Sequence, residues 1–214
     1  MFHGEGSTRN QVAFTGSWVT NPTASATVYY EVQYMRYFPK ITGERLYLSP
    51  MNPEDAEQYT KWLNDPNVAD HLGLYRQMVS LGNEKKYLEQ MSSEGHNYAI
   101  VLKDNDTLIG NISLMDIEHI HRRATLGLFI GEAERRGKGY GAEAIRLILD
   151  YGFNILNLHN VMLLVHADNP QGLACYKKAG FREIGRRREA RIKDGHFIDL
   201  VYMDILASDF AGER

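Results

Sequence analysis

One eight-residue segment carries most of the chemistry in this sequence: Arg135-Arg136-Gly137-Lys138-Gly139-Tyr140-Gly141-Ala142. It follows an apolar run and precedes a stretch of helical periodicity, so we expect it to begin a helix. The first N–H groups of a helix lack partners within the helix and lie at the positive end of its dipole, so they bind phosphate oxygens well. Glycines let the backbone approach an anion closely, and the three basic side chains add charge. The segment therefore predicts a phosphate or pyrophosphate site.

Spacing separates this loop from two other phosphate-binding loops. A P-loop requires glycine, four residues and then Gly-Lys-Ser/Thr, but Lys138 is followed by Gly139, and position 132 is Glu. The dinucleotide fingerprint requires Gly-x-Gly-x-x-Gly, whereas Gly137, Gly139 and Gly141 give Gly-x-Gly-x-Gly. A basic, glycine-rich surface linker is the remaining alternative, and the position between two apolar elements argues against it.

A second segment lies after the next apolar run and carries an Asn, a Tyr and a Gly-Phe pair, at Asn169, Tyr176 and Gly180-Phe181. Together with Arg136-x-x-Gly139-x-Gly141, this segment resembles the GNAT superfamily of acetyltransferases. The resemblance covers roughly residues 41–206. Residues 117–205 are most similar to the ribosomal-protein N-terminal acetyltransferases and the spermidine acetyltransferases.

The resemblance implies a cofactor and a set of residues that hold it. The cofactor is acetyl-CoA, used as a co-substrate, with no metal. Its pyrophosphate would lie on the loop from Arg135 to Ala142, and its pantetheine arm would bond Asn169. A backbone N–H of the strand residues Leu128, Phe129 and Ile130 would bond the thioester carbonyl. Asn169 also suits an ordinary N-cap for a helix that begins at Pro170.

Tyr176 is the candidate catalytic residue. The resemblance implies that its hydroxyl protonates the departing CoA thiolate as a general acid. The alternative is a tyrosine that packs against the core from a short helix. Its neighbour Cys175 points elsewhere on that helix, so we expect a small core residue and no thiol nucleophile. Lys177 and Lys178 are either contacts for the cofactor phosphates or solvated helix residues.

The acceptor side is less defined by the sequence. Four residues beyond the third main strand are candidates for a general base: Asp116, Glu118, His119 and His121. For any single one of them, a solvated polar loop is the better explanation. A basic run follows Phe181 and includes Arg186, Arg187, Arg188, Arg191 and Lys193, and we interpret it mainly as a solvated face. The helices before residue 93 contain no concentrated acidic cage, which weakens the hypothesis of a polyamine acceptor.

Three functions therefore stay open. The first is an N-acetyltransferase that acts on a protein or peptide N-terminus or on a small amine. The second is a polyamine (spermidine or spermine) N-acetyltransferase. The third is a non-catalytic acetyl-CoA-binding sensor, against which Tyr176 argues.

The pattern of elements predicts a mixed α/β (α+β) fold. Seven strands are expected, at 46–48, 98–102, 108–115, 125–130, 161–165, 185–192 and 197–206, with an Asp194-Gly195 hairpin turn between the last two. Helices are expected from Asn52-Pro53 to Leu63, and at 83–92, 140–155 and 171–179. On the third helix, Glu143, Arg146, Asp150 and Asn154 form a polar stripe. The resemblance adds that the central sheet is mixed and its parallel middle strands splay apart.

Length and composition limit the remaining options. The 214 residues suit one domain, which we place at 35–214, with residues 1–34 as an N-terminal extension and 28–38 as an added strand. The net charge of −3 does not suggest nucleic-acid binding, and the single cysteine excludes an internal disulfide. No apolar run is long enough to span a bilayer. We therefore expect a cytoplasmic protein, not bound to membranes, and its sheet edges make a homodimer plausible.

Overall fold

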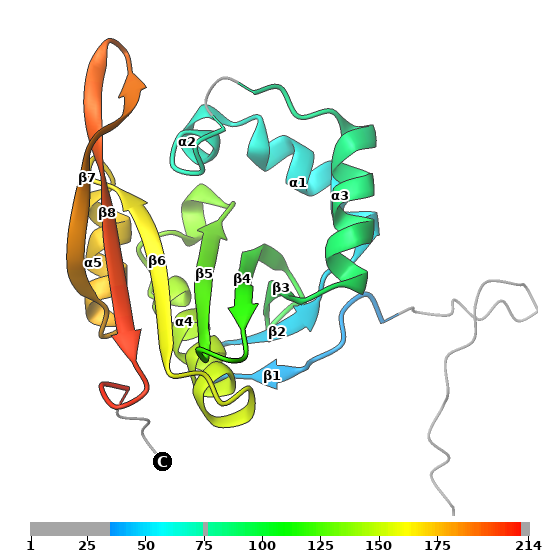
Figure 1. Cartoon of the computed structure of the whole chain (residues 1–214). Helices are drawn as coiled ribbons and strands as arrows, with labels where there is room; N and C mark the ends of the chain where they lie inside the picture. The colour runs from blue at the N-terminus through cyan, green and yellow to red at the C-terminus, as the bar shows by residue number, and fades with distance from the viewer. Residues whose placement is uncertain (1–34, 75–76, 211–214) are drawn as a thin grey trace, which may run out of the picture. The chain divides into compact units, whose positions relative to one another are not determined.

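The computed structural model describes residues 35–74 and 77–210 (Figure 1). The strands are β1 (Ile41–Thr42), β2 (Leu46–Pro50), β3 (His96–Leu102), β4 (Leu108–Glu118), β5 (Arg123–Ile130), β6 (Asn160–His166), β7 (Arg182–Lys193) and β8 (His196–Leu206). The α-helices are α1 (Ala56–Leu63), α2 (Pro66–Ala69), α3 (Leu81–Ser93), α4 (Tyr140–Asp150) and α5 (Pro170–Lys178). Short 3-10 turns occupy Pro53–Asp55 and Ala133–Arg135, and a π-helical turn, Tyr151–Ile155, extends α4.

The strands form one mixed sheet in the order β1-β2-β3-β4-β5-β6-β8-β7. All neighbours are antiparallel except β5 and β6, which are parallel. These two strands pair at only three positions, from Arg123↔Asn160 to Thr125↔Met162. Beyond Thr125 they separate and leave an opening in the middle of the sheet (Figure 1). The predicted mixed sheet with splayed parallel middle strands is confirmed.

Alternation of side chains along the strands divides the core between the two faces of the sheet. Leu46 and Leu48 of β2 pack into the larger core, which α4 covers, whereas Tyr47 between them joins the second core under α1 and α3. β3 repeats this pattern with Ile100 on the first face and Ala99 on the second. Helices α4 and α5 therefore cover one face of the sheet, and α1 and α3 cover the other.

Two element counts differ from the prediction. The eighth strand is β1, whose two residues are too few to produce an alternating pattern in the sequence. The fifth α-helix is α2, which Asp65 caps by accepting a hydrogen bond from the N–H of Asn67. The predicted first helix ends before Asp65-Pro66, but an Asp followed by proline also starts helices, and here it does so.

The expected division at residue 35 stays a prediction, since residues 1–34 lie outside the described part. The same holds for most of the strand expected at 28–38, and residues 35–38 are not in a strand. In the described part, no helix is both long and apolar enough to span a bilayer.

Candidate active site

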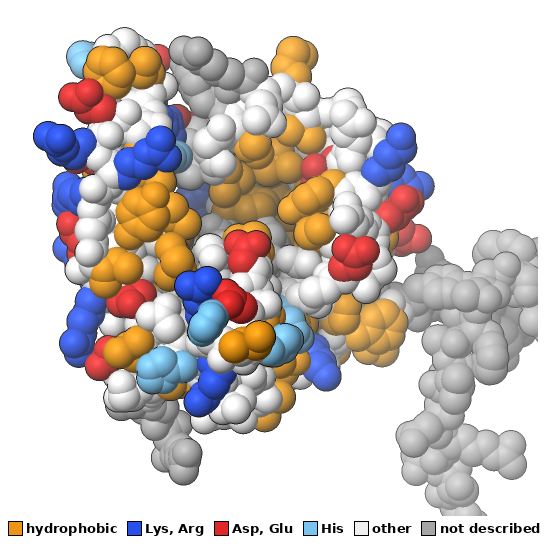
Figure 2. Space-filling model, in the orientation of Figure 1, with side chains coloured by type: hydrophobic (Ala, Val, Ile, Leu, Met, Phe, Trp, Pro, Cys, Tyr) orange, Lys and Arg blue, Asp and Glu red, His pale blue; other side chains and the backbone are white. Residues whose placement is uncertain are grey.

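A cavity of about 870 Å³ occupies the opening between β5 and β6. Its wall includes the end of β5 from Thr125 to Ile130, the loop and first turn of α4 from Arg135 to Ala142, and the end of β6 from Leu164 to His166. Asn169 and Tyr176 complete the wall on the side of α5. Figure 2 shows a hollow with an apolar floor on one face of the molecule, between its β7–β8 side and its α1–α3 side. The predicted catalytic residue and all the predicted cofactor-binding residues thus line one cavity.

The start of α4 borders this cavity and has no side-chain cap. Asn169 caps α5, with its Oδ1 accepting the N–H of Gly172 at 2.8 Å, but no side chain caps α4. Its N-cap is Gly139 at φ +85°, and Gly137 lies at φ +73°, a backbone region that favours glycine. The first N–H groups of α4 are therefore left for another partner.

An arginine that the sequence analysis did not single out holds this loop in place. Arg45, directly before β2, donates from Nη1 to the carbonyl oxygen of Lys138 at 2.9 Å and from Nε to Glu143 at 2.8 Å. The backbone N–H of Arg45 donates to the same carboxylate at 2.8 Å, and its guanidinium lies 4.7 Å from the centre of the Tyr140 ring. These contacts join the first strands to the first turn of α4.

The predicted polar stripe on α4 is wrong at Glu143. This side chain is buried, with 6% of the residue exposed. Burial raises its pKa, but hydrogen bonds from Arg45 outweigh that effect and hold the pKa below its ordinary value. Glu143 is therefore an ionised partner of Arg45 inside the fold, and only the later positions of the stripe, such as Arg146, are exposed.

Arg136 braces the loop against β5. Its Nε donates to the carbonyl oxygen of Ile130 at 3.0 Å and its Nη2 to that of Gly131 at 2.9 Å. Its Nη1 lies 3.5 Å from the carbonyl oxygen of Asn67. The guanidinium thus fixes the loop to the end of β5. From the sequence, this side chain was expected to bind the pyrophosphate instead.

The backbone of β5 presents free donors to the cavity. The N–H of Gly131 donates to Ile109 of the neighbouring strand at 2.9 Å, so it faces β4. Because N–H groups alternate along a strand, that of Phe129 also faces β4, while those of Leu128 and Ile130 face the β6 side. No described strand pairs with β5 on that side beyond Thr125. Of the three predicted residues, two therefore aim their N–H groups at the opening.

Tyr176 projects from α5 into the cavity wall and packs edge-on against Phe181, with ring centroids 6.1 Å apart. Its hydroxyl makes no hydrogen bond with any described residue. Burial raises its pKa, so the hydroxyl is protonated at neutral pH. Cys175 was expected to point into the core, but it also lines the cavity. Burial raises the pKa of its thiol, which disfavours the thiolate needed for nucleophilic attack.

The end of the cavity away from the loop is built around His166. Nη1 of Arg191 lies 2.7 Å from Nδ1 of His166, and because a guanidinium only donates, the ring proton must be on Nε2. Burial lowers the pKa of His166, and Arg191 lowers it further. Arg191 and Lys193 both bond the carboxylate of Asp70, which joins α2 to the β7–β8 hairpin.

None of the four residues expected near the acceptor lines the cavity. Glu118 instead pairs with Arg123 at 2.6 Å and with His121 at 3.3 Å, and Asp116 is exposed at an irregularity between β4 and β5. The basic run is a solvated face only in part, because Arg191 is turned inward. In the part of the chain that the structure describes, the cavity wall contains no Asp or Glu.

Comparisons with known proteins agree with this arrangement. A family model described as an acetyltransferase (GNAT) domain matches residues 45–182. Spermidine N(1)-acetyltransferase of Vibrio cholerae is 34% identical over 127 residues, covering 59% of this chain and 73% of that protein. YdaF of Bacillus subtilis, named as a candidate ribosomal N-acetyltransferase, is 29% identical over 186 residues, covering 80% and 97%.

A solved structure adds the fold. Spermidine N-acetyltransferase from Vibrio cholerae, in complex with CoA and spermine, superposes with a TM-score of 0.69 at 29% identity and covers 77% of this chain and 97% of that one. This chain therefore belongs to the GNAT family of acetyltransferases, and it is an acyltransferase.

Proposed function

We propose that this enzyme transfers the acetyl group of acetyl-CoA to a primary amine that carries a single positive charge, such as a protein or peptide N-terminus or a small amine. The amine attacks the thioester directly while both substrates are bound. The observation that carries the proposal is the one cavity in which an uncapped helix start, free strand donors and an unpartnered tyrosine hydroxyl meet, all within the described residues.

The residues present suit acetyl-CoA. The uncapped N–H groups of α4 and the side chains of Arg135 and Lys138 match the charge of a pyrophosphate. Asn169 is engaged as the cap of α5 through Oδ1, while its side-chain N–H groups are still available to an amide oxygen of the pantetheine arm. The cavity continues between β5 and β6, which suits an extended thioester arm.

Two groups of the chain support the transfer itself. The N–H groups of Leu128 and Ile130 face the space where the thioester carbonyl would lie, and donors there stabilise the oxygen as it gains negative charge. Tyr176 would donate its proton to the CoA sulfur as the C–S bond breaks. The incoming amine loses its own proton to solvent or to a neighbouring base, because a protonated amine has no lone pair for attack.

The acceptor end supports a singly charged amine. Its described wall holds His71 and His166 among apolar residues such as Met115 and Leu164, and no carboxylate. A polyamine carries several positive charges that favour acidic surroundings. Polyamine acetylation is the second candidate, because a relative in sequence and a similar solved structure, both from Vibrio cholerae, are named spermidine acetyltransferases. A sensor without turnover would have no use for the free hydroxyl of Tyr176.

The experiment is to measure CoA release from acetyl-CoA against spermidine, spermine, amino sugars and short peptides with Ala, Ser or Met at the N-terminus. Turnover of a singly charged acceptor at a higher kcat/KM than that of spermidine supports the proposal. A clear preference for spermidine or spermine would replace it with the second candidate. Binding of acetyl-CoA without turnover of any acceptor would favour a sensor.

A further inference from the structure

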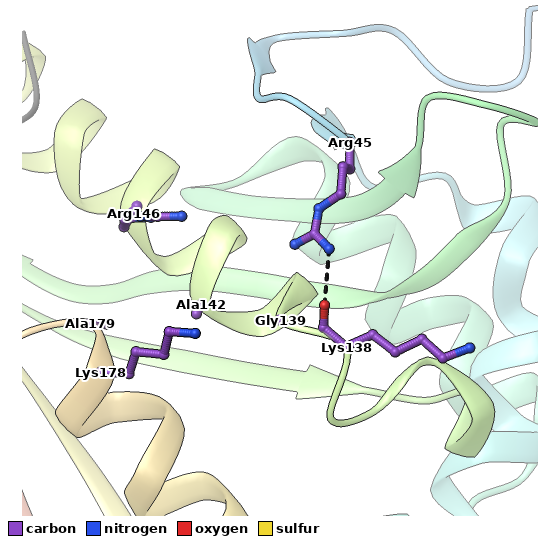
Figure 3. A pocket seen from close by; sticks show the side chains of 7 residues that line it. All are labelled: Arg45, Lys138, Gly139, Ala142, Arg146, Lys178 and Ala179. Carbon is purple, nitrogen blue, oxygen red and sulfur yellow. Dashed lines mark hydrogen bonds between the residues drawn. The ribbon is translucent and has the colours of Figure 1, made fainter.

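A smaller cavity of about 250 Å³ lies next to the start of α4. Its wall combines four basic side chains from four parts of the chain: Arg45, Lys138, Arg146 and Lys178, with Gly139, Ala142 and Ala179 between them. Figure 3 shows Arg146 on α4 and Lys178 at the end of α5 on either side of Ala142, while the side chain of Lys138 extends to the other side of the loop. Arg146 and Lys178 therefore lie on the side of the small cavity away from the loop that is proposed to bind the pyrophosphate.

Most of the positive charge in this cavity is not neutralised. Only Arg45 has an acidic partner, Glu143. In the described part of the chain, Lys138, Arg146 and Lys178 form no ion pair and donate no side-chain hydrogen bond. Some other surface arginines are neutralised by carboxylates, as in the pairs Arg182–Asp209 and Arg186–Glu183. Like charges gathered around a concave site attract an anion.

The two cavities adjoin each other at the start of α4. Lys138, Gly139, Ala142 and Lys178 line both of them. One molecule can therefore place a pyrophosphate on the uncapped start of α4 and a second anionic group beside Arg146, further along the same helix.

We propose that Arg146 and Lys178 bind a phosphate monoester, and that this group is the 3′-phosphate of the CoA ribose. CoA carries both a pyrophosphate and a monoester that has close to two negative charges at neutral pH, so its two anionic groups match the two cavities. This inference rests on the proposed use of acetyl-CoA. It gives the enzyme a means of selecting CoA over 3′-dephospho-CoA.

The test is calorimetric binding of CoA and of 3′-dephospho-CoA to the full chain, without an acceptor. We expect the unaltered protein to bind CoA about tenfold more tightly, since a charge-assisted contact in a partly exposed site contributes roughly that factor. In the double variant Arg146→Ala/Lys178→Ala, the ratio of the two affinities should fall close to one. The affinity for CoA should decrease, while the affinity for 3′-dephospho-CoA should stay the same. Lys177→Ala is the matched control, because this lysine is also on α5 but lines neither cavity.

The outcomes separate this inference from the function on which it rests. Equal affinities for the two ligands in the unaltered protein overturn the 3′-phosphate site and leave acetyl-CoA binding intact. An equal loss of CoA affinity in Lys177→Ala overturns the assignment to Arg146 and Lys178, because general surface charge would then explain the effect. Binding of inorganic phosphate that the double variant abolishes, with equal affinities for the two ligands, overturns the proposal in favour of a site for free phosphate. Failure to bind either ligand overturns the proposed function itself.

Discussion

Replacing Asp70 with asparagine tests how the end of the large cavity around His166 is held together. Asp70 caps the C-terminus of α2 and bonds Arg191 and Lys193, which lie 121 and 123 residues later in the chain. The side chains of Asp70 and Arg191 are 9% and 13% exposed. Asparagine keeps the shape of the side chain and one acceptor oxygen but removes the charge.

The expected loss follows from the burial of the Asp70–Arg191 pair. Removing one partner of a buried ion pair costs about 3–5 kcal/mol, because the other charge is left without compensation. The amide oxygen of the new side chain would still accept one hydrogen bond, so we expect a loss of about 2–3 kcal/mol in the free energy of unfolding. For a protein of this size, that corresponds to a decrease in Tm of about 4–12 °C.

Urea unfolding of Asp70→Asn, Arg191→Met and the double variant measures the pair directly. The double-variant cycle should give a coupling energy above about 1 kcal/mol. Arg187→Met is the control, since this arginine on the same strand forms no ion pair in the described part of the chain. A loss below about 0.5 kcal/mol for Asp70→Asn, or equal losses for the two arginine variants, would refute the reasoning.

The same variant should show a characteristic pH dependence. Burial raises the pKa of Asp70, but hydrogen bonds from Lys193 and Arg191 outweigh it and hold the pKa below the ordinary 3.8. The unfolded chain therefore takes up the proton at a higher pH than the folded protein does. The stability difference between the two proteins should be constant from about pH 7 to about pH 5 and shrink as the pH falls through the folded-state pKa.

Two further variants test the cofactor side. Tyr176→Phe should lower kcat by about 10²–10⁴ while the Kd for acetyl-CoA, measured by calorimetry, stays unchanged; an unchanged kcat would remove Tyr176 as the general acid. Glu143→Gln should weaken CoA binding a few-fold and cost about 1 kcal/mol of stability, because the partner Arg45 is partly exposed. Glu44→Gln, an exposed neighbour of Arg45, should change neither quantity, and equal effects in both would mean that the ion pair does not position the loop.

Local signals account for the parts of the fold that the sequence predicted. Asn52 accepts the N–H of Glu54 at 3.0 Å, as its position before proline indicated. Asp194 and Gly195 both adopt positive φ, 49° and 80°, which is the conformation of the tight turn that Asp-Gly favours between two strands. Each of these signals lies within a few residues of the structure that it specifies.

The contacts that position the site are of another kind. Arg45 and Glu143 are 98 residues apart, and Asp70 and Arg191 are 121 residues apart. A single sequence contains no motif or characteristic spacing that would indicate either pair. His166 had a weak local signal, as a polar residue at the end of a buried strand that borders the opening, and it was still missed. The sequence therefore predicted which segments line the large cavity, but not which side chains hold them there.

Charge pairing, more than the number of charges, distinguishes the two basic regions of this chain. The hairpin β7–β8 has more basic residues, but three of its arginines are committed to Asp209, Glu183 and Asp70. Its other arginines, Arg187 and Arg188, line neither cavity. Around the start of α4, Lys138, Arg146 and Lys178 are basic, border cavities and lack acidic partners in the described residues. A cation that folding leaves uncompensated at a concave site retains its full attraction for an anionic ligand. This charge pattern favours an anionic cofactor at α4, and it explains how a chain with a net charge of −3 could still bind one.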